Sequence, residues 1–120
     1  MIANIFIIGL GLIGGSLGLA IRGTPQVRTV NGFDIDPHTM QQALQMGAID
    51  AGVELAAGAA QADVIIICAP LRFYAGIIEE IKPNLKPGCI VTDVGSTKQP
   101  VMQLFKHIPD NVFCVGGHPM

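Results

Sequence analysis

The chain of 120 residues has few charged side chains, and those it has include no basic excess. Charged residues make up 13% of the sequence, and the formal net charge is −2 at pH 7. Without a basic surface, nucleic acid is not expected as a partner. Half of the residues are hydrophobic, which suits strands that are covered on both faces.

Long apolar runs and a basic leader are also missing. No stretch of the sequence approaches the roughly 18 to 20 apolar residues that a membrane span requires. The first residues contain no basic segment followed by a cleavage site, and their apolar run is better used as a core strand. We therefore expect a cytoplasmic protein with no membrane partner.

Cysteine is scarce, and its spacing is not that of a metal site. Cys68, Cys89 and Cys114 form no C-x-x-C pair, and each lies in or beside an apolar run. We expect small buried hydrophobic residues rather than metal ligands. The sequence also lacks internal repeats, low-complexity segments and linkers, so we expect a single domain.

The sequence does contain a glycine-rich motif, G-x-G-x-x-G, directly after the apolar run of residues 5–8. Gly9 permits a tight turn, Gly11 lets a pyrophosphate approach the backbone, and Gly14 lets the following helix pack close. The first helical N–H groups, at Leu12 and Ile13, then face the phosphates. The motif predicts dinucleotide binding at these five residues; the alternative is a glycine-rich turn with no ligand.

An acidic residue stands at the expected distance from this motif. Asp34 lies twenty positions beyond Gly14, at the end of a second apolar run, and is followed by Ile35 and Asp36. A carboxylate there accepts hydrogen bonds from the adenosine ribose hydroxyls and repels a 2′-phosphate. Because no Arg or Lys follows, Asp34 and Ile35 predict NAD rather than NADP. The alternative is that Asp34 is only a turn residue.

Strand and helix signals alternate along the whole chain. We expect strands over 4–8, 27–33, 51–53, 63–68, 89–92 and 112–115, and helices over 13–22, 37–46, 55–61, 73–81 and 98–107. The first helix is expected to turn Leu17, Ala20 and Ile21 inward. Asp36 and Pro37 are expected to start the second helix. This order predicts an α/β fold of the doubly wound Rossmann type, with a mostly parallel sheet of about six strands.

In such a sheet, ligands bind beyond the carboxyl ends of the strands, where five turns should lie along one edge. One of them, Cys68-Ala69-Pro70, is expected to form a wall against the cofactor through its backbone. An ordinary strand terminator is the alternative at these three residues. No base partner for Cys68 can be identified, so we do not expect it to act as a nucleophile.

Two further turns at this edge are rich in polar residues, namely 92–98 and 116–120. His118 follows two glycines and precedes a proline, and its side chain has an unperturbed pKa near neutrality, as a base requires. Ser96 shares the other turn, where a simple helix cap is the alternative. A structural histidine is likewise the alternative at position 118. His38 and His107 are expected at the surface of helices.

Four segments together resemble the prephenate/arogenate dehydrogenases of tyrosine biosynthesis. They are Gly9–Ser16, Phe33–Asp36, Asp93–Lys98 and Gly117–Met120. The resemblance implies oxidative decarboxylation of prephenate with NAD, which gives 4-hydroxyphenylpyruvate. It implies that His118 is the catalytic histidine and accepts a hydrogen bond from the C4 hydroxyl. It also implies that Ser96 orients this histidine and contacts the nicotinamide side.

The resemblance further implies a mostly helical second domain that contributes dimer contacts and an arginine for the substrate carboxylates. We expect this chain to be the nucleotide-binding part of a homodimeric enzyme, able to bind NAD but nearly inactive alone. Two alternatives stay open. The chain could be a non-catalytic NAD-sensing module, or it could be the nucleotide domain of an arogenate dehydrogenase or another small-substrate dehydrogenase.

Overall fold

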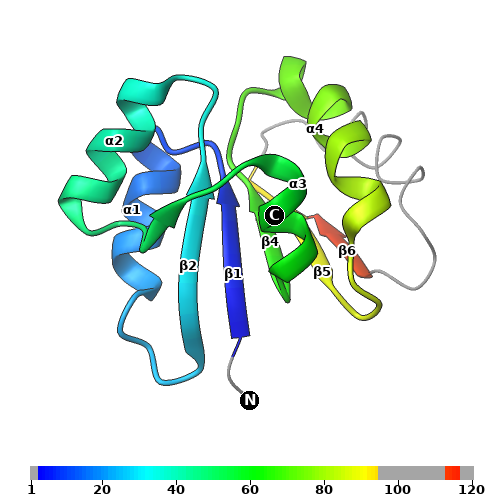
Figure 1. Cartoon of the computed structure of the whole chain (residues 1–120), viewed down its shortest axis with the longest axis horizontal. Helices are drawn as coiled ribbons and strands as arrows, with labels where there is room; N and C mark the ends of the chain where they lie inside the picture. The colour runs from blue at the N-terminus through cyan, green and yellow to red at the C-terminus, as the bar shows by residue number, and fades with distance from the viewer. Residues whose placement is uncertain (1–2, 95–112, 117–120) are drawn as a thin grey trace.

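The computed structural model describes residues 3–94 and the strand at 113–116. Its centre is a parallel sheet of six strands in the order β3-β2-β1-β4-β5-β6 (Figure 1). All five strand pairings are parallel, so the carboxyl ends of the strands lie at one edge of the sheet. The predicted Rossmann-type fold is confirmed. The strand order reverses between β1 and β4, which is where such sheets bind ligands.

The elements follow the expected alternation closely. The strands are β1 (Ala3–Ile8), β2 (Val27–Phe33), β3 (Ala51–Gly52), β4 (Val64–Ile67), β5 (Ile90–Asp93) and β6 (Phe113–Gly116). The helices are α1 (Leu12–Ile21), α2 (Pro37–Met46), α3 (Leu55–Gln61) and α4 (Tyr74–Ile81), with short 3₁₀ turns at Leu71–Phe73 and Lys82–Asn84. The helix expected over 98–107 lies outside the described residues.

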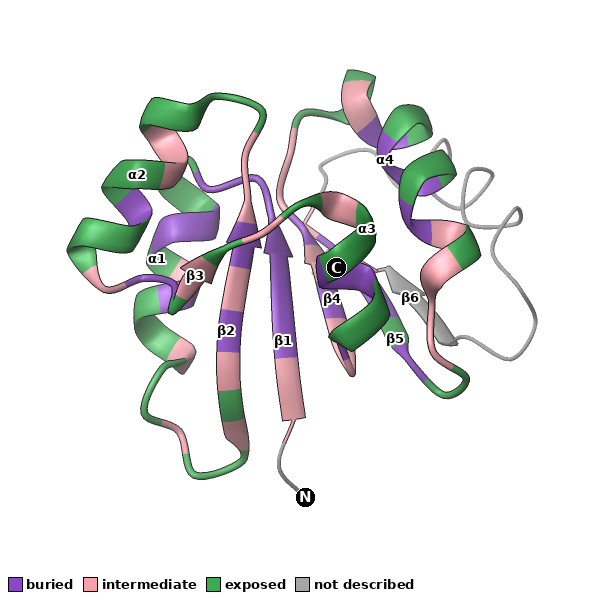
Figure 2. Ribbon diagram, viewed as in Figure 1, coloured by how far each residue is buried: buried purple, intermediate pink, exposed green. Residues whose placement is uncertain are grey.

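Helices cover both faces of the sheet, and β1 is buried between them (Figure 2). Phe6 and Ile8 point into one core with α3 and α4, while Ile5 and Ile7 point into a second core with α1 and α2. A strand buried on both faces needs a continuous apolar run, which explains why residues 5–8 carry no polar side chain.

The inward face of α1 differs from the prediction. Its buried residues are Gly14, Gly15 and Gly18, whereas Ala20 is exposed and Leu17 is only half-buried. A Cβ atom at position 18 would overlap the carbonyl oxygen of Ala48. The helix therefore approaches neighbouring backbone so closely that glycine occupies the contact face. The expectation that Ala20 faces inward was wrong, and Leu17 is only half-buried, whereas Ile21 packs against the second core as expected.

The start of α2 is formed as predicted. The Asp36 carboxylate accepts hydrogen bonds from the His38 N–H at 3.0 Å and from the Thr39 hydroxyl at 3.1 Å. Pro37 occupies the first turn, and Gly47 ends the helix with φ of 80°. His38 is exposed, as expected. These caps fix the direction in which the chain leaves the edge of the sheet after Asp34.

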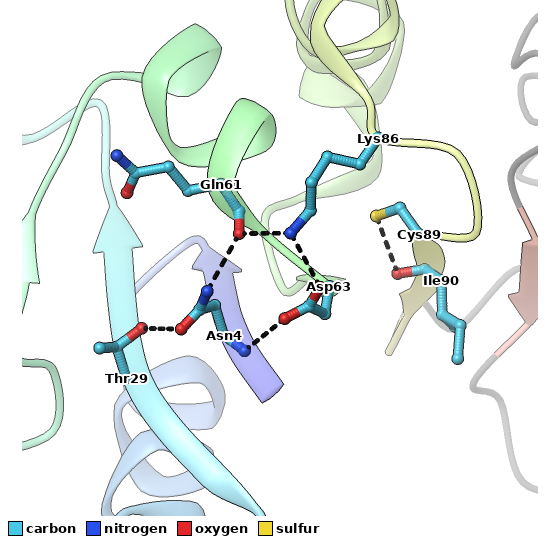
Figure 3. Close-up of polar contacts among 7 residues, drawn as sticks. All are labelled: Asn4, Thr29, Gln61, Asp63, Lys86, Cys89 and Ile90. Atoms are coloured by element: carbon cyan, nitrogen blue, oxygen red, sulfur yellow. Dashed lines mark hydrogen bonds and ion pairs between the residues drawn. The ribbon is translucent and has the colours of Figure 1, made fainter. Parts of the chain in front are cut away.

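A separate polar cluster joins strands near their amino ends (Figure 3). The Asp63 carboxylate accepts the backbone N–H of Asn4 and pairs with the Lys86 ammonium, each at 2.8 Å. The Asn4 side chain in turn accepts the Thr29 hydroxyl at 3.0 Å. Figure 3 shows these contacts linking β1, β2 and the connection that precedes β4. The cluster stabilises the end of the sheet opposite to the predicted ligand edge.

Candidate functional site

The glycine-rich turn leaves β1 at the carboxyl edge of the sheet, where backbone segments are too close for side chains. Gly9 has φ of 97°, and its N–H donates to the Phe33 carbonyl at 2.8 Å. A Cβ atom at Gly9 would lie 2.7 Å from the backbone nitrogen of Ala69. Both the conformation and the space at this position therefore require glycine.

Gly14 and Gly11 meet different surroundings. A Cβ atom at Gly14 would overlap the carbonyl oxygen of Gly9, so this glycine is needed for the helix to fold back on the turn. A Cβ atom at Gly11 would have no atom within 4 Å, and Gly11 has an ordinary φ of −69°. Packing within the chain therefore does not explain Gly11, whereas room for a ligand beside the backbone does.

The amino end of α1 offers backbone N–H groups without a competing carboxylate. The helix begins at Leu12, its N-cap is Gly11, and its first turn contains no acidic residue. The first N–H groups of a helix have no acceptor within it, and the helix dipole adds a partial positive charge there. A phosphate group fits this arrangement.

The Asp34 carboxylate is tied to the glycine-rich turn. One of its oxygens accepts the Leu10 N–H at 2.8 Å, and the other accepts the Asp36 N–H at 2.9 Å. Each carboxylate oxygen can accept a second hydrogen bond, so both remain able to receive a hydroxyl group. Asp34 therefore holds the turn in place and can bind a ribose at the same time.

Both features border a cleft of about 710 Å³ at the switch between β1 and β4. The cleft brings together all ten residues predicted to bind the cofactor. They are Gly9, Gly11, Leu12, Ile13, Gly14, Asp34, Ile35, Cys68, Ala69 and Pro70. Sequence reasoning missed the wall that the Leu71–Phe73 turn and α4 form, which includes Phe73 from the turn and Ile77 and Glu80 from α4. Only the amphipathic pattern of that helix could have signalled an inward face, and it does not distinguish core from cleft.

The cleft is mostly apolar and carries negative charge. Its charged members are Asp34 and Glu80, and no Lys or Arg occurs among the described residues that line it. Leu12, Ile13 and Ile35 leave 88%, 59% and 72% of their surface exposed. Apolar side chains left open beside a cleft suit the flat faces of a bound base or ring.

Below the β4 side of the cleft lies a group of three titratable side chains. Burial, reinforced by the negative charge of Asp93, raises the pKa of the Cys68 thiol to about 11. Burial also raises the pKa of Tyr74, whose hydroxyl donates to Asp93 at 3.1 Å. Cys68 is thus a neutral thiol near pH 7.

Asp93 was expected in a polar turn but is the last residue of β5, and it is only 2% exposed. Ser96 and His118, the predicted catalytic residues, lie outside the described residues. The strands that precede them are neighbours in the sheet, and Asp93 pairs in register with Gly116. Ser96 follows Asp93 by three positions, and His118 follows Gly116 by two.

Two other kinds of site are absent from the part of the chain that the structure describes. No three side chains of His, Cys, Asp or Glu are grouped there so as to hold a metal ion. None of the helices described there is both long and apolar enough to cross a membrane.

Comparison with known proteins identifies relatives of this domain. A prephenate dehydrogenase of Lactococcus lactis is 38% identical and covers 98% of this chain and 34% of its own length. Prephenate dehydrogenase of A. aeolicus, crystallised with hydroxyphenyl propionate and NAD+, has a TM-score of 0.86 at 29% identity. The match covers the whole of this chain and 42% of the length of that protein. Arogenate dehydrogenase of Synechocystis has a TM-score of 0.75 at 31% identity, and the match covers 97% of this chain and 40% of the length of that protein.

The chain thus spans about a third of the length of the curated relative that it matches. Residues 17–120 match the family described as the nucleotide-binding domain of prephenate dehydrogenase. The match excludes the glycine-rich turn, which many dehydrogenases share, and therefore rests on the rest of the chain. On these matches, the chain belongs to the family of prephenate dehydrogenase nucleotide-binding domains.

Proposed function

We propose that this chain binds NAD for an enzyme that oxidises and decarboxylates prephenate in the cytoplasm. The observation that carries the cofactor assignment is the cleft, which combines an open Gly11, a free helix end and Asp34. Asp34 would hold the adenosine ribose, and the N–H groups at the start of α1 would hold the pyrophosphate. Ile35 would cover the adenine, and the Cys68-Ala69-Pro70 turn would line the other end.

The absence of a lysine or arginine from the described lining of the cleft supports NAD over NADP, because a 2′-phosphate would meet the Asp34 carboxylate without a compensating cation. When bound, NAD supplies the acceptor for the hydride that leaves the substrate. Every other task falls to side chains and backbone groups of the protein.

The chemistry proposed for the substrate end involves His118 and Ser96. In its neutral form, the His118 imidazole would take the proton of the C4 hydroxyl as the hydride leaves C4. It would return that proton to the same oxygen once carbon dioxide is lost and the ring becomes aromatic, which gives the phenol. Ser96 would orient the imidazole. Support comes from the topology, because both residues follow neighbouring strands whose last residues, Asp93 and Gly116, lie side by side.

The cofactor assignment is tested by titrating the 120-residue chain with NAD+ and NADP+ in a calorimeter. We expect NAD+ to bind at least about tenfold more tightly, and Asp34→Asn to lose about tenfold in NAD+ affinity because a ribose acceptor is weakened. Asp36→Asn, which alters a neighbouring carboxylate of the α2 cap, is the matched control and should keep the preference. Equal affinity for both dinucleotides would contradict the assignment.

The catalytic assignment requires the full-length enzyme. We expect His118→Asn to lower kcat about 10²- to 10⁴-fold, the usual contribution of a general base, with the Kd for NAD+ unchanged. Exposed His38, replaced in the same way, serves as the control. The isolated chain should bind NAD+ and show little or no turnover. Normal kcat in the His118 variant would remove this residue from the mechanism.

A second substrate, arogenate, is favoured by one observation, the likeness to the Synechocystis arogenate dehydrogenase. The two substrates differ in the side chain that the ring carries, an amino acid in place of a keto acid. Measuring kcat/KM of the full-length enzyme for both decides between them. We expect prephenate to be the better substrate.

A further inference from the structure

Two glycines in the described part of the chain have no reason within the fold to be glycine, and both line the cleft. Every other glycine whose surroundings the structure describes has a positive φ or has atoms within 4 Å of the place that a Cβ atom would take. Gly11 and Gly76 have neither. Gly11 lies at the proposed pyrophosphate site, whereas Gly76 has no part in the proposed function so far.

Gly76 lies in the interior of α4, where alanine is the better helix former. The residue is exposed, and a Cβ atom there would meet no atom within 4 Å. The fold would therefore accept a side chain at this position, and that side chain would stand in the cleft. As at Gly11, room for a ligand explains the glycine.

The wall of the cleft on this side is one face of α4. Its members are Phe73, which directly precedes the helix, and Gly76, Ile77 and Glu80 within it. These residues are spaced three or four positions apart, so they lie on the same side of the helix. Gly76 leaves a strip of bare backbone beside the apolar Phe73 and Ile77. A flat ring fits against such a surface.

The ring that reaches this wall would be the adenine. Phe33, which directly precedes Asp34, packs on the same core as α4, and so does Leu55 at the start of α3. Both also line the cleft. A base attached to the ribose proposed at Asp34 therefore has Ile35 on one side and the wall formed by α4 on the other.

Glu80 supplies the charged group of this wall. Its backbone carbonyl accepts the Asn84 side-chain amide at 3.3 Å, but its carboxylate makes no hydrogen bond or ion pair with any residue that the structure describes. The neighbouring Glu79 is different, because it pairs with Lys82 at 3.1 Å on the surface. An ionised carboxylate can only accept hydrogen bonds, so Glu80 suits a ligand that carries a donor.

We propose that Glu80 is a specificity residue that accepts a hydrogen bond from the 6-amino group of the adenine, and that Gly76 makes room for the base. The proposal rests on the proposed NAD function and deepens it. Hypoxanthine carries a carbonyl oxygen at position 6 in place of the amino group. That oxygen would face the Glu80 carboxylate as one acceptor against another, which disfavours binding.

The test compares the Kd values of the 120-residue chain for NAD+ and for nicotinamide hypoxanthine dinucleotide at pH 7. The two dinucleotides carry the same charge there, so the ratio of their Kd values reports the contact at position 6. We expect the wild type to bind NAD+ about three- to tenfold more tightly, as one hydrogen bond to an exposed carboxylate predicts.

Glu80→Gln removes this preference, because an amide at the same place can donate as well as accept. We expect the ratio to fall to within about twofold of unity, mainly through tighter binding of the hypoxanthine dinucleotide. Glu79→Gln is the matched control and should keep the ratio of the wild type within about twofold. Circular dichroism checks that both variants are folded, and the comparison in the wild type needs no variant.

Gly76→Ala tests the room for the base. We expect it to weaken binding of NAD+ and of ADP-ribose by the same factor, about fivefold or more, because both contain the adenosine. The melting temperature should not fall, since the added methyl group meets no atom of the protein. Ala75→Ser adds one atom at an exposed position outside the described lining of the cleft and should leave both affinities unchanged.

Three results would count against these assignments, each in a different way. Equal affinity of the wild type for the two dinucleotides, or an unchanged preference in folded Glu80→Gln, overturns the role of Glu80 while leaving NAD binding intact. Full NAD+ affinity in Gly76→Ala overturns the role of Gly76. Failure of the wild type to bind NAD+ overturns the proposed function instead.

Discussion

Gly11 and Gly14 stand three positions apart in one motif, yet the structure gives them different reasons to be glycine. Gly14 faces the carbonyl oxygen of Gly9, so the fold itself excludes a side chain there. Gly11 faces open space in the cleft and has a backbone conformation that any residue adopts. The fold tolerates a methyl group at Gly11, whereas a bound pyrophosphate would not.

This contrast predicts that alanine at one position lowers stability and that alanine at the other weakens cofactor binding. Gly14→Ala should lower the free energy of unfolding by about 1 to 3 kcal/mol, as overpacking does. Gly11→Ala should leave the melting temperature nearly unchanged and weaken NAD+ binding about tenfold or more. Thermal melts and calorimetric titrations measure both quantities. A destabilised Gly11→Ala with full affinity would contradict the distinction.

Residue types and spacing were sufficient to predict that the glycines, Asp34 and the Cys68-Ala69-Pro70 turn meet at one edge of the sheet, because each follows a strand directly. Their role in holding a cofactor stays a prediction. Asp93 and Tyr74 could not be predicted in the same way. Their contact joins residues nineteen positions apart. A polar residue at the end of an apolar run also looks like the start of a turn, so the burial of Asp93 becomes evident only from the packing of α4 on β5.

At the scale of elements, α1 lies against the connection between α2 and β3. Gly18 faces the Ala48 backbone. Beyond the helix, Arg22 donates to the Gly47 carbonyl and pairs with Asp50 at 2.6 Å. Periodicity suggested Leu17 and Ala20 for the inner face because apolar residues usually fill it. In α1 the Ala48 backbone lies so close to the helix that only glycine fits at position 18, and apolar side chains do not occupy this contact.

The same geometry predicts opposite effects of alanine in two helices. Gly18→Ala should destabilise the domain by about 1 to 3 kcal/mol, because its methyl group would meet the Ala48 carbonyl. Gly76→Ala in α4 meets no atom within 4 Å and should stabilise by about 0.5 to 1 kcal/mol through the higher helix propensity of alanine. Urea unfolding at pH 7 gives both values. Equal effects of the two substitutions would contradict the packing of α1.

At the scale of the whole molecule, alternation of strands and helices was enough to predict the parallel sheet and the edge that carries the cleft. Right-handed crossovers leave few arrangements for such a chain. The exact neighbours depend on packing of the two cores, which no local pattern encodes. The helical segment expected over 98–107 and the catalytic pair stay predictions.

The stability of the whole domain at alkaline pH depends on two groups with raised pKa values, the Cys68 thiol and the Tyr74 hydroxyl. The pKa of Cys68 is raised from 9.0 to about 11, so the unfolded chain loses this proton first as the pH rises. The stabilisation is complete below pH 9 and is lost between pH 9 and 11, by about 2 kcal/mol. Tyr74, whose pKa is also raised, adds to the loss above pH 10.

Urea unfolding at pH 8, 9.5 and 10.5 measures this loss. In Cys68→Ser, whose hydroxyl does not titrate in this range, the part of the loss that begins near pH 9 should disappear. The loss that begins above pH 10 should persist in that variant and shrink in Tyr74→Phe. A stability that is flat up to pH 10.5 in the wild type would rule out this account.

The double engagement of Asp34 has a consequence for how cofactor preference can evolve. A substitution of Asp34 that accommodates a 2′-phosphate also removes the acceptor of the Leu10 N–H. This hydrogen bond helps to hold the glycine-rich turn in the shape proposed to bind the pyrophosphate. A lineage that changes this residue alone would pass through a form that binds neither dinucleotide well. The route to NADP therefore begins with a change that supports the turn in another way, and only then reaches position 34.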